Sequence, residues 1–244
     1  MRPLSLRVTC PNASVSTSQF PVEVPTWAGL DVPEAGPSES AVPKSVMLAG
    51  GIWLLLILAG SLWMAHYSQT AGSAGAPPER WPETSLVRRD PERPQLLMFL
   101  HPRCACSRAT LGELELLMAH CQGLVSAQVL FIQPEGVTED WVKTDLWRSA
   151  AAIPGVNVSV DHEGGEALRF RTATSGQALL YDLKGRLIFQ GGITLARAHS
   201  GDNPGRSALE GLLRHKAGTL ASTPVFGCAL SEKEARDECT PCQP

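Results

Sequence analysis

The feature that most constrains this chain is a run of 20 uncharged residues, VMLAGGIWLLLILAGSLWMA, at positions 46–65. A helix of that length rises about 30 Å, which matches the hydrocarbon core of a bilayer. A secretory signal peptide is the competing interpretation. However, 45 residues precede the run, and it is longer than the apolar core of a usual signal. We therefore expect a single transmembrane helix over residues 46–66.

Charges near this helix predict its orientation. Lys44 abuts the helix on the N-terminal side, whereas the first fixed positive charge on the other side is Arg80. Because positive charges favour the cytoplasmic side, we expect a cytoplasmic N-terminus and an exported C-terminal part.

The rest of the chain divides by composition. A Pro-rich tail over 1–45 has no helical or strand period and is expected to be disordered. Small residues and Pro predict a flexible linker over 67–93. One compact domain is expected over 94–217, followed by a Cys-containing tail over 218–244. The net charge of −3 gives no reason to expect a nucleic-acid partner.

Apolar runs and helical periods alternate through the domain. The patterns predict strands at 95–100, 128–132, 156–160, 178–181 and 186–190, and helices at 107–121, 138–151, 166–170 and 204–216. Strands separated by helices favour a parallel sheet, and the last two strands form an antiparallel hairpin. The expected fold class is α/β with a mixed sheet.

Chemistry concentrates where the first strand turns into a helix, in the sequence His101-Pro-Arg103-Cys104-Ala-Cys106-Ser107. A thiol at a helix N-terminus lies near unpaired N–H groups and the positive end of the helix dipole. Both favour the nucleophilic thiolate. Arg103 adds positive charge, and His101 does so when protonated.

This arrangement resembles the thioredoxin-like superfamily over about residues 93–216. The strand at 156–160 is similar to that of the peroxiredoxin-like and membrane-tethered cytochrome-maturation branches. The motifs HPRCACSRA, GGITLARAHSGDN and VFGCAL resemble bacterial membrane-anchored thioredoxin-like (RedB-like) proteins, whose activity is unsettled. The resemblance implies a thioredoxin-like fold, thiol–disulfide chemistry and a bacterial inner (cell) membrane location facing the periplasm.

The chain departs from that family at two positions. In the usual Cys-x-x-Cys register, Cys104 is the attacking residue and the resolving position falls on Ser107. Cys106 either forms a strained Cys-x-Cys disulfide with Cys104 or points elsewhere. The family's cis-proline is replaced by Ser175 or Gly176, which puts ordinary disulfide exchange in doubt and favours metal capture.

Two further segments supply candidates. The loop after the hairpin carries Arg197 and His199, which either approach Cys104, where the His acts as acid or base, or face solvent. The C-terminal tail holds Cys228 and the pair Cys239 and Cys242, which either pass electrons to the site or form structural bridges. The seven cysteines divide into Cys10 before the membrane helix and six after it, an even number for an oxidising compartment.

Three functions compete. The first is a membrane-tethered thiol–disulfide oxidoreductase acting on protein or small-molecule thiols through Cys104 and Cys106. The second is a soft-metal protein, since thiolates select ions such as Cu(I); its ligands would be Cys104 and Cys106 with His101 or His199. The third is a non-catalytic binding module on the same scaffold. The sequence has no nucleotide loop, no paired-carboxylate site and no serine-hydrolase elbow, so no cofactor is expected.

Overall fold

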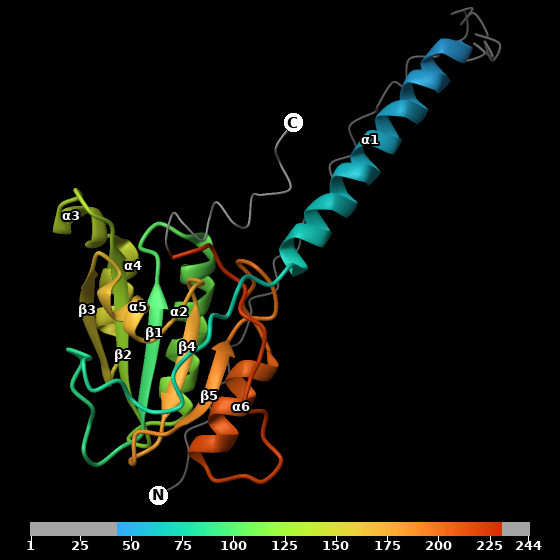
Figure 1. Ribbon diagram of the computed structural model, residues 1–244. Coiled ribbons are helices and arrows are strands. Elements are labelled where there is room, and N and C mark those ends of the chain that lie inside the picture. Colours follow the sequence, from blue (N-terminus) through green and yellow to red (C-terminus); the bar gives the residue numbers. More distant parts are fainter. Residues whose placement is uncertain (1–42, 231–244) are drawn as a thin grey trace, which may run out of the picture. The chain divides into compact units, whose positions relative to one another are not determined.

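The computed structural model describes residues 43–230 (Figure 1). The predicted tail before residue 43, together with Cys239 and Cys242, lies outside these residues. The elements, in order, are α1 (Lys44–Gln69), β1 (Gln95–Leu100), α2 (Ala105–His120), β2 (Ser126–Gln133), α3 (Glu139–Val142), α4 (Asp145–Ala152), β3 (Val156–His162), α5 (Gly165–Arg169), β4 (Gln177–Tyr181), β5 (Leu187–Gly192) and α6 (Pro204–Leu213).

Helix α1 contains the long apolar run. It begins two residues before the predicted span of 46–66 and ends three residues after it. In the described part of the chain it is the single helix long and apolar enough to cross a membrane. Its length and composition suit a single-pass anchor.

The five strands form one sheet in the order β3-β2-β1-β4-β5. Strand β1 is parallel to β2, with Leu97 opposite Gln128, and antiparallel to β4, with Leu97 opposite Leu179. The hairpin turn between β4 and β5 depends on Asp182, whose carboxylate accepts the N–H groups of Lys184 and Arg186. The expected fold class, α/β with parallel strands and a closing antiparallel hairpin, is confirmed.

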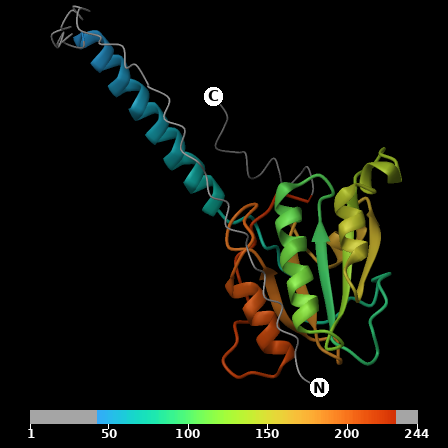
Figure 2. The ribbon, with the colours of Figure 1, turned by 180° about the vertical axis from the view of Figure 1, so that it is seen from behind.

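Both faces of the sheet are covered. Helices α2, α4 and α6 pack on one face, as seen from behind in Figure 2, around Met98, Phe131 and Leu209. The other face packs Phe99, Phe170 and neighbouring side chains against α5. Central strand β1 is buried at all six positions, which explains its continuous apolar sequence.

The segment predicted as a flexible linker, 67–93, makes fixed contacts over much of its length. Trp81 packs edge-on against Phe170 and Tyr181, with ring centroids 5.0 and 5.2 Å apart. The Tyr181 hydroxyl donates to the Pro78 carbonyl at 3.0 Å. This segment therefore forms part of the cover of the second sheet face, which its small residues and prolines did not predict. The domain boundaries themselves stay a prediction.

The single helix predicted from Thr138 to Ala151 is wrong. The chain forms two short helices there, α3 and α4, separated by Lys143 and Thr144. The Thr144 hydroxyl donates to the carbonyl of Pro102, in the turn after β1, at 3.1 Å. Thr144 adopts an extended backbone at the N-cap of α4, so this long-range bond accompanies the interruption.

Candidate functional site

Cys104 lies at the turn between β1 and α2. It is the N-cap residue of α2, with an extended backbone (φ −104°, ψ 130°). Its side chain makes no capping hydrogen bond of the kind that a Ser or Asp oxygen accepts at this position. The helix begins at Ala105, two residues earlier than predicted. The N–H groups of Cys106 and Ser107, in the first turn, therefore lie beside the Cys104 sulfur. The first turn of a helix has no partners for these N–H groups within the helix, so they are available to a thiolate.

Three cysteines meet at this turn. The Sγ atoms of Cys104, Cys106 and Cys228 all lie within 4.8 Å of one another. The Cys104 and Cys228 sulfurs are 2.9 Å apart, although the two residues are 124 positions apart in the chain. Cys104 and Cys106 are buried, whereas Cys228 is exposed. All three are free thiols in this structure, and the described residues contain no disulfide.

The three thiols have unequal acidity. Contacts from Cys106 and Cys228, with the two backbone N–H groups, hold the pKa of the Cys104 thiol far below its ordinary value, against the opposing effect of burial. The Cys104 thiolate in turn raises the pKa of Cys106 and, strongly, that of Cys228. These opposite directions favour the thiolate on Cys104 over one on Cys106 or Cys228.

Ser107 occupies the resolving position of the usual motif, and its hydroxyl is used structurally. It is fully buried, donates to the His101 carbonyl at 2.8 Å, and lies 2.9 Å from the Ser175 hydroxyl. Ser175 also accepts the N–H of His101 at 2.9 Å. The described residues contain no cis peptide bond, so the peptide bonds at Ser175 and Gly176, the two positions predicted to replace the family's cis-proline, are trans. The two hydroxyls therefore hold the end of β1 to the start of β4.

The charged residues beside the motif stack on an aromatic ring. The Arg103 guanidinium lies over Trp141 at 5.0 Å, and the His101 ring meets the same indole edge-on at 5.4 Å. Burial is the main cause that lowers the pKa of His101, while the Cys104 thiolate opposes it. His101 is therefore disposed to be neutral near neutral pH, and its Nδ1 accepts the N–H of Arg103 at 3.2 Å.

The loop after β5 reaches the site through its backbone. The N–H of Ala198, a residue with positive φ (55°), faces Cys106 and favours its thiolate. The Arg197 guanidinium donates to the Gly227 carbonyl, next to Cys228. The His199 side chain is exposed and, among the described residues, has no hydrogen bond or ion pair with a cysteine. The two side chains, which were expected either to approach Cys104 or to face solvent, therefore differ. Arg197 approaches the cysteine cluster, and His199 faces solvent.

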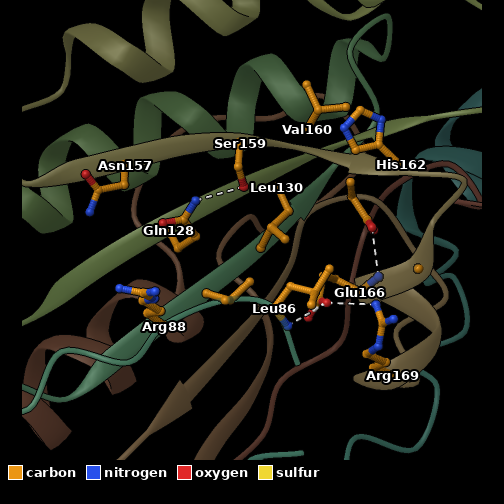
Figure 3. Close-up of a pocket in the computed structure, with 13 residues that line it drawn as sticks. Leu86, Arg88, Gln128, Leu130, Asn157, Ser159, Val160, His162, Glu166 and Arg169 are labelled. Atoms are coloured by element: carbon orange, nitrogen blue, oxygen red, sulfur yellow. Dashed lines mark hydrogen bonds and ion pairs between the residues drawn. The ribbon is translucent and has the colours of Figure 1, made fainter. Parts of the chain in front are cut away.

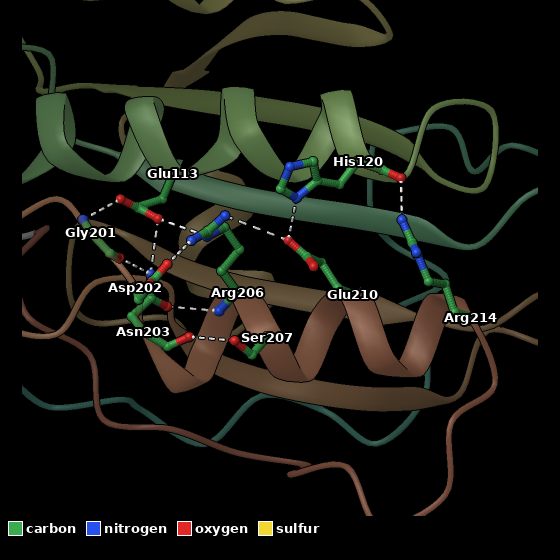
Figure 4. A network of polar contacts seen from close by, with 9 residues as sticks. All are labelled: Glu113, His120, Gly201, Asp202, Asn203, Arg206, Ser207, Glu210 and Arg214. Atoms are coloured by element: carbon green, nitrogen blue, oxygen red, sulfur yellow. Dashed lines mark hydrogen bonds and ion pairs between the residues drawn. The ribbon is translucent and has the colours of Figure 1, made fainter.

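A buried carboxylate on α2 fixes this loop (Figure 4). Glu113 is 1 % exposed and accepts the Gly201 N–H at 2.7 Å and the Asn203 side-chain amide at 3.0 Å. It also forms an ion pair with Arg206 Nε at 2.9 Å. Asn203 caps α6 by accepting the Arg206 N–H, as the Asn-Pro sequence predicted. The loop is thus tied to α2, the helix that contains Cys106 and has Cys104 as its N-cap.

The structure also has a cavity of about 430 Å³ away from the three cysteines, none of which lines it (Figure 3). Its lining combines strand residues Gln128, Leu130 and Ser159 with Arg88 and Arg169. Gln128 donates to Ser159 at 2.9 Å. Arg169 pairs with buried Glu166 at 2.8 Å, which also accepts the Ser85 hydroxyl. Glu166, which also accepts the N–H of Leu86 at 3.0 Å, thereby joins Ser85 and Leu86 to α5.

Sequence reasoning selected the three cysteines but missed several of their supports. Trp141 lies in α3 and Glu113 in α2, and no local pattern joins them to Cys104, whereas Ser175 was one of the two positions expected to replace the family's cis-proline. The polar Glu113 within an otherwise apolar helix face is the one signal that was available. The roles assigned to the predicted site residues stay predictions.

Comparisons with known proteins are limited to structures. No protein-family model and no curated protein matches this chain. An uncharacterized conserved protein from Geobacillus kaustophilus is 18% identical, with a TM-score of 0.50 over 67% of this chain and 92% of its own. A hypothetical protein from Sinorhizobium meliloti is 18% identical, with a TM-score of 0.48 over 66% and 93%. The exposed lipoprotein thioredoxin Etrx1 from Streptococcus pneumoniae is 14% identical, with a TM-score of 0.38 over 50% and 84%.

At these identities the likeness concerns the fold alone. The narrower resemblance to RedB-like proteins stays a prediction. The mixed sheet, the cysteine turn between β1 and α2, the β4–β5 hairpin and the closing helix α6 together give this chain a thioredoxin-like fold.

Proposed function

We propose that this chain is a membrane-tethered thiol–disulfide redox protein in which Cys104 is the reactive thiolate and Cys106 belongs to the same site. The observation that carries the proposal is the position of Cys104 at the N-terminus of α2. Two backbone N–H groups and two neighbouring thiols there stabilise its charge. Such a thiolate attacks a disulfide readily or leaves readily from one.

The proposal includes a location and a class of partner. Helix α1 is the single-pass anchor in the inner membrane of a bacterium, with the N-terminus cytoplasmic and the thioredoxin-like domain exported. In that oxidising compartment the partners are thiols or disulfides of proteins or small molecules.

The direct test is the thiol state of the full-length chain in detergent, equilibrated in buffers of reduced and oxidised glutathione. After acid quenching and alkylation, mass spectrometry reports each cysteine. Cys104 is expected to change from thiol to disulfide as the buffer becomes more oxidising. A Cys104 that stays a thiol throughout removes the proposal.

A second function is favoured by one specific observation, the three sulfur atoms within 4.8 Å of one another. Three thiolates at a common point suit a soft ion such as Cu(I). Cys228 would then take the third ligand position expected for a histidine, because His199 faces solvent. Titration of the reduced chain with Cu(I) against a coloured chelator tests it: one ion bound per chain, and loss of that binding in Cys228→Ser, would favour metal binding.

A further inference from the structure

The segment 222–230, called here the C-terminal strap, is held across the cysteine turn by backbone hydrogen bonds on both sides of Cys228. The Ser175 N–H donates to the Cys228 carbonyl at 2.8 Å, and the Leu230 N–H donates to the Ala173 carbonyl at 2.8 Å. Upstream, the Gly72 and Gly192 N–H groups donate to the Val225 and Pro224 carbonyls at 2.9 and 3.2 Å. The strap is therefore paired to the domain like a short strand.

Packing fixes the strap as closely as the hydrogen bonds do. A Cβ atom on Gly227 would lie 1.8 Å from the Ser175 carbonyl oxygen, so the backbones touch where a side chain would otherwise be. Arg197 donates to the Gly227 carbonyl from the opposite loop. Cys228 thus enters the site at a fixed position, and its sulfur lies 2.9 Å from that of Cys104.

The three cysteines differ in their exposure to solvent. Cys104 and Cys106 are buried, while Cys228, which the strap carries, is the exposed member of the cluster. Ser107, at the usual resolving position, is fully buried and bonded to Ser175. An incoming thiol therefore meets Cys228 first, at the surface.

We propose that Cys228 is the redox partner of Cys104, and that the Cys104–Cys228 disulfide is attacked by outside thiols at Cys228, the exposed residue of the pair. This inference rests on the proposed redox function and names the second cysteine of its cycle. Cys106 remains a thiol that hydrogen-bonds the Cys104 thiolate.

Two substrate thiols are the co-reactants that reduce the Cys104–Cys228 disulfide. The first substrate thiolate attacks Cys228 Sγ; a sulfur–sulfur bond forms between them, the Cys104–Cys228 bond breaks, and Cys104 leaves as a thiolate. A second substrate thiolate then attacks the substrate sulfur of this mixed disulfide and releases Cys228, which takes up a proton. Two substrate thiols are oxidised to one disulfide, and two electrons reduce the Cys104–Cys228 pair. Cys104 is the N-cap residue of α2, and the unpaired N–H groups of the first helical turn favour a thiolate leaving from that position.

Trypsin makes the pairing measurable, because its cleavage sites separate the relevant cysteines. Cleavage after Arg103 and Arg108 releases CACSR with both Cys104 and Cys106, and cleavage after Lys216 and Lys233 releases a peptide with Cys228 alone. Cys239 and Cys242 follow Arg236 and leave in a third peptide. A crosslink between the first two peptides reports the proposed disulfide, and an internal disulfide within CACSR reports the alternative.

The experiment oxidises the full-length chain in detergent with oxidised glutathione and compares Cys106→Ser, Cys104→Ser and a Cys239→Ser/Cys242→Ser control. We expect the crosslink in the unsubstituted chain, the control and Cys106→Ser, and its loss in Cys104→Ser, with glutathione then carried on Cys228. An internal CACSR disulfide without a crosslink overturns the inference and leaves the redox function standing. A crosslink lost in Cys106→Ser but kept in Cys104→Ser overturns the pairing, and thiols that never oxidise overturn both proposals.

Discussion

A disulfide between Cys104 and Cys228 would close a loop of about 125 residues, and this gives a stability prediction. The two cysteines are 124 positions apart. In the chain-entropy model a crosslink over that distance removes about 16 cal/mol/K from the unfolded chain, or about 5 kcal/mol at 25 °C. A Cys104–Cys106 disulfide closes a loop of only three residues and stabilises the fold by about 1.5 kcal/mol before strain.

The two disulfides therefore differ by about 3 kcal/mol in the free energy of unfolding, which is more than a hundredfold in the folded-to-unfolded ratio. The measurement is urea unfolding of the full-length chain in detergent micelles, followed by tryptophan fluorescence, after complete oxidation or reduction. With a slope of about 2 kcal/mol/M, a gain of 5 kcal/mol raises the urea midpoint by about 2.5 M.

Two variants serve as controls for that measurement. Cys228→Ser is expected to keep at most the ~1.5 kcal/mol of a Cys104–Cys106 disulfide on oxidation, while the Cys239→Ser/Cys242→Ser double variant keeps the full gain. The reasoning is refuted if oxidised chains that carry the mapped Cys104–Cys228 bond unfold within about 1.5 kcal/mol of reduced chains. Such a result would mean that the unfolded chain already holds the strap near the site, or that the bond strains the native turn.

Three further predictions concern single positions. Glu113→Ala removes a buried carboxylate that accepts two hydrogen bonds and pairs with Arg206, and is expected to cost about 3 kcal/mol in urea unfolding. Glu115→Ala, exposed on the same helix, is expected to change stability by less than about 0.5 kcal/mol, and equal effects would contradict the role of the network. Because the fold depresses the pKa of Cys104, the Cys104 thiolate persists as the pH falls below 8, and its normalised alkylation rate should stay on a plateau there. Burial raises the pKa of Cys121, so the normalised alkylation rate of Cys121 should decline over the same pH range. Gly227→Ala forces a methyl group into a carbonyl oxygen and should abolish the tryptic crosslink under oxidation; an undiminished crosslink would show that the strap is not held as described.

The parts of the fold that local pattern determines were predictable. Strand β1 is buried on both faces, so its apolar run Gln95–Leu100 matched the prediction residue for residue. The hairpin and the Asn203 cap depend on side chains within a few residues of the backbone groups that they bind. Cys104 at the start of α2 followed from the same kind of local reasoning.

The rest of the site could not be predicted because it depends on contacts distant in sequence. The meeting of Cys104 and Cys228 requires the strap to pair with Ser175, and nothing in the sequence near Cys228 specifies that edge. The break between α3 and α4 accompanies a hydrogen bond from the Thr144 hydroxyl to the Pro102 carbonyl. The spacing of apolar residues along one helix does not predict such a contact with a distant segment. Trp81 is one large apolar residue in a linker-like sequence, and its burial against Phe170 appears only in three dimensions.

The contact at Gly227 also predicts how other chains with this site can be recognised. Since no Cβ fits against the Ser175 carbonyl oxygen, a strap that brings a third cysteine to this turn must carry Gly immediately before it. The identifying signature is then discontinuous: Cys-x-Cys-Ser at a strand-to-helix turn, Ser-Gly before the hairpin, and Gly-Cys beyond the last helix. A search for Cys-x-x-Cys at the strand-to-helix turn finds no match in this chain, where Ser107 takes the second cysteine position, whereas the spaced pattern identifies it.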